Sequence, residues 1–180
     1  MTNDSEKSRT TIIKATTDWV PKINHLVNAA YRGEFSKKGW TTEADLLGGQ
    51  RIDEERIQEI IEDSHSNVFL LITQNHELLG CVHLKIEMES TYLGMLTIWP
   101  ELQGKGHAKS LISYCEEWTK AHNVNTIRMT VITKRPELIE YYMRRGYFLS
   151  GKKEHFPTND PRFGIPKVTG LEFVELIKLL

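Results

Sequence analysis

The sequence predicts an α/β fold with a mixed sheet, in which strands and helices do not simply alternate. Segments with strand-like and helix-like apolar patterns follow one another in the order β-α-α-β-β-β-α-β-α-β-β. The three central strands are separated by turns short enough for an antiparallel meander. After the third of them, a proline and a glycine-rich turn lead directly into a helix, over residues 96–108.

The expected strands combine β-branched or aromatic residues with turn signals at their ends. They are Thr10–Thr16, Asn67–Thr73, Leu78–Met88, Tyr92–Trp99, Thr126–Ile132, a strand that begins at Tyr147, and Leu171–Leu180. Before the first strand we expect a disordered lead over residues 1–9. Between the last two strands, residues 151–170 contain Pro and Gly and are expected to form a loop.

The expected helices begin at capping residues, acids or prolines, and the last one ends at a glycine. In chain order, these signals are Thr17 or Asp18 with Pro21, Asp53-Glu54-Glu55, the glycine-rich turn before Ala108, and Pro136 followed by Gly146. Residues 33–50, between the first two helices, are polar and rich in Gly and Thr, so we expect an irregular segment there.

Length and composition are those of one globular domain over residues 10–180. The formal net charge of −1 argues against a nucleic-acid-binding or anionic-membrane-binding protein. No apolar run approaches the roughly 18 residues of a membrane helix, and the polar N-terminus does not resemble a secretory signal. Cys81 and Cys115 lie in apolar patterns, so we expect two buried, reduced thiols in a cytoplasmic protein.

The glycine-rich turn is the most informative part of the sequence. Gly104 and Gly106 allow left-handed backbone, and the helix after them begins with N–H groups that have no partner inside the helix. Such a helix start favours a phosphate group, and Lys105 and Lys109 add cations at the same end. The spacings of the two common nucleotide loops, Gly-x-x-x-x-Gly-Lys-Ser/Thr and Gly-x-Gly-x-x-Gly, are absent from the sequence.

The turn does match Gln/Arg-x-x-Gly-x-Gly/Ala, through Gln103, Gly106 and Ala108. This pattern resembles the acetyl-CoA loop of the GNAT superfamily of N-acetyltransferases. The order of elements is similar to the GNAT fold over nearly the whole chain, which implies a central mixed sheet flanked by about four helices. In that fold two neighbouring strands splay apart at the middle of the sheet, and CoA lies in the gap.

A second motif supports the resemblance, because residues 140–147 are similar to the family's Leu-Tyr-x-x-x-Gly-Phe signature. The resemblance implies that Tyr142 lies beside the CoA sulfur and is the general acid for the leaving thiolate. Without the resemblance, the favoured reading of Tyr142 is a core aromatic residue of a helix. The chain departs from the family where Arg135 replaces a usual Asn and Leu138 a usual Ala, and we expect Arg135 to meet CoA phosphates instead.

The resemblance also implies the rest of the cofactor site. The pantetheine arm is expected along the backbone of residues 96–98, where an N–H near Ile98 polarises the thioester oxygen. The pyrophosphate is expected on the amides of residues 103–108. The expected cofactor-binding residues are Leu96, Thr97, Ile98, Gln103, Gly104, Lys105, Gly106, His107, Ala108, Lys109 and Arg135.

Two residues are candidates for the general base. Glu87 and His83 have the same parity on the strand next to the cofactor strand, so they share one face. If that face is toward the substrate, either of them could accept the proton; if it is outward, both are solvated polar residues.

The segment after the first helix is where the family usually builds its acceptor site. Glu34, Glu43 and Asp45 could attract an amine there, with Trp40 covering it. The alternative is a polar surface loop with one anchoring aromatic residue. Residues 155–166 could form a lid over the same site.

The sequence therefore predicts an acetyl-CoA-dependent N-acetyltransferase that acts on a primary amine of a small molecule or peptide. No Cys/His arrangement suggests a covalent intermediate, which favours direct attack in a ternary complex. The alternatives are a non-catalytic acyl-CoA-binding module and a transferase of a longer acyl group. We expect no metal, no nucleic acid and no membrane as partners, and we leave a homodimer open.

Overall fold

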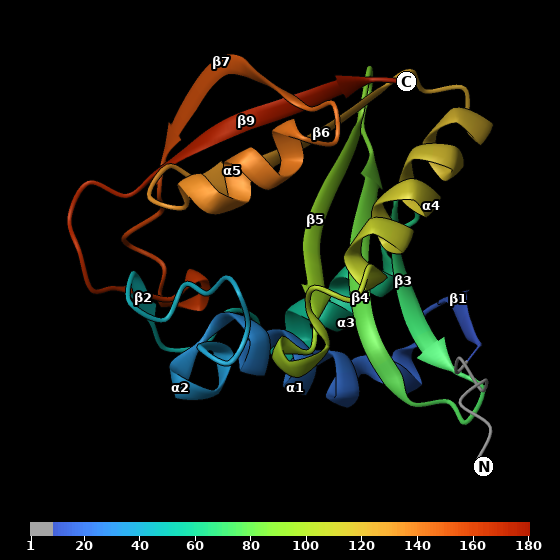
Figure 1. The fold of residues 1–180 in the computed structure, drawn as a ribbon, viewed down its shortest axis with the longest axis horizontal. Coiled ribbons are helices and arrows are strands. Elements are labelled where there is room, and N and C mark those ends of the chain that lie inside the picture. Colours follow the sequence, from blue (N-terminus) through green and yellow to red (C-terminus); the bar gives the residue numbers. More distant parts are fainter. Residues whose placement is uncertain (1–8) are drawn as a thin grey trace, which may run out of the picture.

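The structure is a computed structural model and describes residues 9–180. Apart from Arg9, the lead that we expect to be disordered lies outside the described residues. The rest folds around a seven-stranded mixed sheet, as the sequence predicts (Figure 1). In spatial order its strands are β1 (Thr10–Lys14), β3 (Ser66–Thr73), β4 (Leu78–Ile86), β5 (Thr91–Ile98), β6 (Thr126–Ile132), β9 (Glu172–Leu179) and β7 (Phe148–His155).

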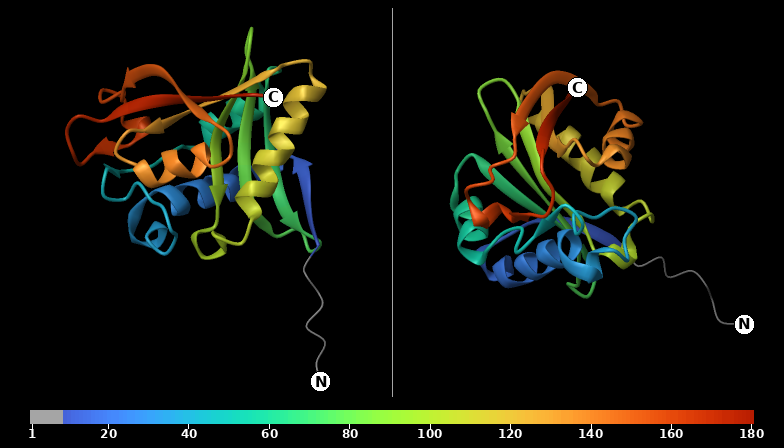
Figure 2. Two further views of the ribbon diagram at one scale, coloured as in Figure 1. Left: turned by 45° about the horizontal axis from the view of Figure 1, so that its top comes forward. Right: turned by 90° about the vertical axis from the view of Figure 1, so that its left-hand side faces the viewer.

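The helices cover both faces of this sheet. They are α1 (Val20–Tyr31), α2 (Gly33–Ser36), α3 (Glu54–Glu62), α4 (His107–Ala121) and α5 (Pro136–Met143), with 3-10 turns at Thr17–Trp19, Pro100–Leu102 and Pro161–Phe163. In the right-hand view of Figure 2, α1 and α3 lie on one side of the strands and α4 on the other. The start of α3 is fixed as expected by Asp53, whose carboxylate accepts a hydrogen bond from the Arg56 N–H at 2.7 Å.

The alternation of side chains along β3 explains why helices pack on both faces. Phe69 and Leu71 point to the core beneath α4, and Val68 and Leu70 point to the core beneath α1 and α3. All four side chains are buried. The apolar run of β3 is therefore that of a strand covered on both sides.

The sheet opens between β5 and β6. These two strands are parallel and pair only at Thr91 with Ile127 and Tyr92 with Arg128, whereas every other neighbouring pair of the sheet is antiparallel. Beyond Tyr92 the strands diverge (Figure 1). The backbone edge of β5 from residue 94 onward is therefore left without a neighbouring strand on that side.

Two segments expected to be irregular join each other. Within residues 33–50 and 151–170, the short strands β2 (Leu47–Gly48) and β8 (Ile165–Pro166) pair with each other. Lys167 strengthens this contact, because its Nζ donates to the Ala44 carbonyl at 2.6 Å. The strand that begins after Tyr147 also runs to His155, farther than the sequence predicts.

Cys81 and Cys115 are buried free thiols, which confirms that prediction. Burial raises the pKa of the Cys81 thiol to about 12. In the described part of the chain, each helix is too short or too polar to cross a lipid bilayer.

Candidate active site

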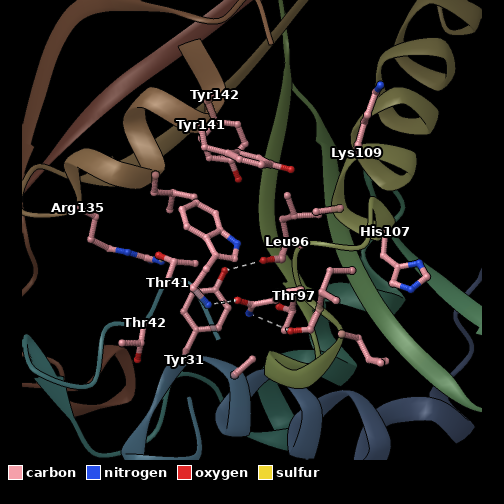
Figure 3. A pocket seen from close by; sticks show the side chains of 18 of the residues that line it. Tyr31, Thr41, Thr42, Leu96, Thr97, His107, Lys109, Arg135, Tyr141 and Tyr142 are labelled. Atoms are coloured by element: carbon pink, nitrogen blue, oxygen red, sulfur yellow. Dashed lines mark hydrogen bonds between the residues drawn. The ribbon is translucent and has the colours of Figure 1, made fainter. Parts of the chain in front are cut away.

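A cavity of about 400 Å³ lies where β5, the start of α4 and α5 meet (Figure 3). It contains all but one of the predicted cofactor residues, together with Tyr142, Trp40 and Glu43. Those cofactor residues are Leu96, Thr97, Ile98, Gln103, Gly104, Gly106, His107, Ala108, Lys109 and Arg135. The exception is Lys105, whose side chain is exposed and does not line the cavity.

The free edge of β5 presents the Ile98 N–H to this cavity. The Trp99 N–H donates to the Leu79 carbonyl on β4 at 3.1 Å, so by antiparallel alternation the polar groups of Ile98 point away from β4. The Ile98 carbonyl accepts a hydrogen bond from Gln103 Nε2 at 3.3 Å. The Ile98 N–H lies on the same open edge, where no strand of residues 9–180 pairs with it.

The glycine-rich turn adds a second group of backbone donors. Gly104 and Gly106 have φ values of +76° and +89°. A Cβ would meet no atom within 4 Å at either position, so the glycines are needed for their conformation and not for space. Gly106 precedes α4, and the first bond of that helix runs from the Ser110 N–H to the Gly106 carbonyl at 3.1 Å. The N–H groups of residues 107–109 are therefore left for a ligand.

Tyr142 lies between α5 and the open edge of β5. Figure 3 shows Tyr141 and Tyr142 reaching from α5 toward Leu96. The Tyr142 ring is packed edge-on against Tyr141 and Tyr147, and α5 ends just beyond it because Gly146 has a φ of +87°. Burial raises the pKa of the Tyr142 hydroxyl well above its ordinary value, so the group stays protonated at neutral pH.

The sequence of residues 23–147 matches the model of the acetyltransferase (GNAT) family. The chain belongs to this family. No curated protein matches the chain in sequence.

Solved GNAT structures have the same fold over almost the whole chain. An acetyltransferase from Bacillus cereus, named as an IAA acetyltransferase, superposes with a TM-score of 0.68 at 14% identity, over 96% of this chain and 100% of that one. A ribosomal-protein-alanine N-acetyltransferase from Escherichia coli gives 0.69 at 15% identity, over 95% and 94% of the two chains. Spermidine N-acetyltransferase from Vibrio cholerae, solved with CoA and spermine, gives 0.67 at 19% identity, over 96% of each chain.

The motif glutamine of this GNAT chain has a structural role that its motif does not reveal. Gln103 Oε1 accepts the Trp40 N–H at 3.0 Å while Nε2 binds the Ile98 carbonyl, so one side chain ties the 40–43 segment to the end of β5. A Cβ on Gly39 would collide with the Gln103 amide, so this link requires glycine there. Trp40 is thereby held over the cavity, at a ring-centroid distance of 5.4 Å from Tyr141.

The predicted base candidates lie away from this cavity. The Glu87 carboxylate accepts hydrogen bonds from Arg128 at 2.6 and 2.7 Å, and Arg128 lowers its pKa. His83 is buried on the face of β4 that α3 covers, and its Nε2 lies 3.1 Å from Ser66 Oγ. Neither residue lines the cavity that contains Tyr142, and their shared strand parity does not bring them to it.

The predicted acceptor residues divide into two sets. Glu34 and Asp45 point to solvent and both pair with Lys37, at 2.9 and 3.1 Å, so they lie outside the cavity. Glu43 is buried and pairs with Arg32 and, at 2.8 Å, with Arg135. The other Nη of Arg135 donates to Thr41 Oγ1 at 2.6 Å, so both of its amino groups are already hydrogen-bonded to the 41–43 segment.

The cavity also contains residues that the sequence analysis does not single out. The Tyr31 hydroxyl donates to the Leu96 carbonyl at 2.9 Å, across 65 positions of sequence. Arg145 lies over the Tyr141 ring, with its guanidinium carbon 3.4 Å from the ring centre. The sequence could have indicated Arg144 and Arg145, because they are two cations directly before Gly146 in the second motif, and both line the cavity. No comparable pattern marks Tyr31.

We predict that Gly106→Ala weakens CoA binding about tenfold, because a left-handed alanine strains the turn and displaces its amides. Gly151→Ala is a matched control: Gly151 has the same φ of +89°, equally open space, and a position on β7 outside the cavity. Both variants should lose about 1–2 kcal/mol of unfolding free energy in urea. Equal CoA affinity of the two variants in calorimetry would contradict the assignment of the turn.

A pH dependence of stability is expected from His83. Burial, followed by the charges of Lys85 and Arg56, lowers the pKa of this imidazole to about 4. The folded state therefore binds a proton at His83 more weakly than the unfolded state does. The fold has its full stability above about pH 6.5 and loses stability as the pH falls toward 4. Between pH 7 and 4.5, the wild type should lose roughly 2–3 kcal/mol more than His83→Gln in urea unfolding. The exposed neighbour gives the control variant, and His65→Gln should follow the wild type.

Proposed function

We propose that the chain transfers an acetyl group from acetyl-CoA to a primary amine, by direct attack in a ternary complex. The observation that carries the proposal is that the Ile98 N–H, the free amides at the start of α4 and the Tyr142 hydroxyl all face one cavity. Membership of the GNAT family and the N-acetyltransferase relatives support this reaction class. The expected compartment is the cytoplasm.

The residues of the cavity fit acetyl-CoA. The amides of residues 107–109, backed by Lys109, suit the pyrophosphate, and the open edge of β5 suits the pantetheine amides. When bound, acetyl-CoA supplies the thioester. Arg144 and Arg145 at the same cavity offer further cations for phosphate groups.

Two of the catalytic requirements, stabilisation of the oxyanion and protonation of the leaving thiolate, are met by named groups of the chain. The Ile98 N–H donates to the thioester oxygen and stabilises the negative charge that develops there. The Tyr142 hydroxyl gives its proton to the departing sulfur. We propose direct transfer because the cavity is lined by no cysteine of the described residues. We propose neither His83 nor Glu87 as the general base, because both lie away from this cavity.

The test is thiol release from acetyl-CoA with a panel of primary amines, including peptide N-termini and a polyamine. The expected result is thiol release that depends on the amine, with intersecting lines in double-reciprocal plots when both substrates are varied. Parallel lines in these plots would contradict direct transfer. Tight CoA binding without release for any amine would identify a binding module instead, and faster release from longer acyl-CoA would contradict the acetyl preference.

A further inference from the structure

We infer that the acceptor carries a carboxylate beside its primary amine, and that Arg51 binds this carboxylate. This inference rests on the proposed function, and it names the class of acceptor. Its basis is the charge of the second cavity that opens on Tyr142.

The acceptor route is a second cavity, of about 220 Å³, on the far side of the gap between β5 and β6. It shares six lining residues with the first, so the two meet at the reacting position: Tyr31, Glu43, Leu96, Arg135, Leu138 and Tyr142. A third cavity, of about 390 Å³, continues outward from it. Arg51, Tyr92 and Phe163 line both of these outer cavities.

The acid nearest the reacting position is already neutralised. Glu43 lies between Arg32 and Arg135, and all three side chains are buried. The Nε of each arginine is buried without a hydrogen-bond partner in residues 9–180. Arg135 Nε also lies 3.7 Å from the Glu137 carboxylate, so the acids of this cluster are already paired and none is left to bind a second positive charge on the acceptor.

Arg51 adds a cation that no acid of the described residues pairs with. Its backbone is fixed, because the Arg51 N–H donates to Asn28 Oδ1 at 2.6 Å and Asn28 Nδ2 donates to the Ile52 carbonyl at 2.8 Å. The guanidinium lies over the Tyr31 ring, 5.4 Å from its centre. It stands where the second and third cavities join, on the path toward Tyr142.

The other arginines of the outer cavities are already paired with acids. Arg56 and Arg162 line the third cavity but pair with Glu59 and Asp160, at 2.7 and 2.8 Å, and Asp53 there caps α3. Glu154, on the exposed strand β7, is the remaining acid at the second cavity. Since Glu34 and Asp45 point elsewhere, the acidic surface that a polyamine would need is absent from the described site. An unpaired guanidinium instead matches a carboxylate through two parallel hydrogen bonds.

The remaining wall of the second cavity is apolar. Its side chains include Leu47, Met129, Val131, Phe156, Phe163 and Phe173. An amine with a nearby carboxylate and an apolar body is an apolar α-amino acid, and this is the class that the cavity fits best.

The experiment compares ligands that differ only in the carboxylate. The ligands are the N-acetyl derivatives of leucine, methionine and phenylalanine, each compared with its C-terminal amide. Each is titrated against the CoA-bound protein by calorimetry. Acetylation removes the titrating amine from both members of a pair, so they differ only in the carboxylate. We expect at least one acid to bind about 10- to 100-fold more tightly than its amide. That ratio should fall toward one in Arg51→Ala and be partly restored in Arg51→Lys. Arg9→Ala, which removes the same charge far from the cavities, should keep it.

Equal binding of acid and amide in the wild type, or an unchanged ratio in Arg51→Ala, would overturn the inference. Thiol release separates this failure from that of the proposed function. Faster release with phenethylamine or spermidine than with leucine, methionine or phenylalanine overturns only the acceptor class. No release with any amine overturns the transferase proposal itself.

Discussion

Glu43→Gln is expected to lower the free energy of unfolding by about 3–5 kcal/mol, the largest stability effect that we predict. The Glu43 carboxylate is buried between Arg32 and Arg135, and its removal leaves Arg32 without a counter-charge and Arg135 with only Glu137, 3.7 Å from its Nε. Glutamine keeps the shape and one acceptor oxygen, so the loss reports the charge and not a cavity.

The control for this change is Glu34→Gln, at an acid that is exposed and pairs only with Lys37. Its free energy of unfolding in urea should stay within about 0.5 kcal/mol of the wild-type value. A Glu43→Gln protein as stable as Glu34→Gln would show that the arginines relax to other partners.

The same charge predicts a difference in acid sensitivity. Burial by itself raises the pKa of Glu43, but Arg135 and Arg32 outweigh it and hold the pKa below its ordinary value. A carboxyl with a lowered pKa stabilises the fold at neutral pH and loses that contribution as the pH falls below its unfolded value. The difference in stability between the wild type and Glu43→Gln should therefore shrink in acid.

Tyr142→Phe is expected to reduce kcat by about 10²- to 10⁴-fold, the usual contribution of a positioned general acid. The ring, which packs against Tyr141 and Tyr147, is kept, so CoA affinity and unfolding free energy should change little. Because burial raises the pKa of Tyr142 above its ordinary value, the hydroxyl remains protonated throughout the neutral range. The loss of rate should therefore be similar from about pH 6 to 9.

Tyr114→Phe is the matched control for the lost hydroxyl. Tyr114 lies on α4, packs against Phe69 at a centroid distance of 4.9 Å and does not line the cavity. Its turnover should equal that of the wild type. If Tyr142→Phe also turned over at the wild-type rate at every pH, another group or water would have to protonate the thiolate.

The glycine-rich part of the site could be predicted because it depends on local backbone conformation. A positive φ at Gly104 and Gly106 requires a particular residue type at a particular position, and such a requirement is visible in the sequence. The same holds for Gly146, which ends α5 four residues after Tyr142. The glycine-rich turn and Tyr142 accordingly line one cavity, as their motifs predict.

The roles of the charged side chains could not be predicted in this way. Strand parity placed His83 and Glu87 on one face. It did not show that Arg128 binds Glu87 or that Ser66 lies against His83. Glu34, Glu43 and Asp45 are similar in sequence, yet only Glu43 is buried between arginines, one of them 92 positions away. The pairing of a charge depends on which distant segment packs against it, and no local pattern records that.

The sequence by itself determined the order of elements and the glycine-rich turn before α4, which follow from backbone conformation and apolar periodicity acting over a few residues. The splayed sheet and the place of Tyr142 near that turn were implied by the resemblance of its motifs to the GNAT family. Only the tertiary structure decided that Gln103 ties Trp40 to β5, that Glu43 is neutralised, and that Arg51 lies at the second cavity with no acid of residues 9–180 paired to it. Those facts depend on contacts across the gap between β5 and β6, where segments far apart in the chain meet and where electrostatic energy is set by burial and distance.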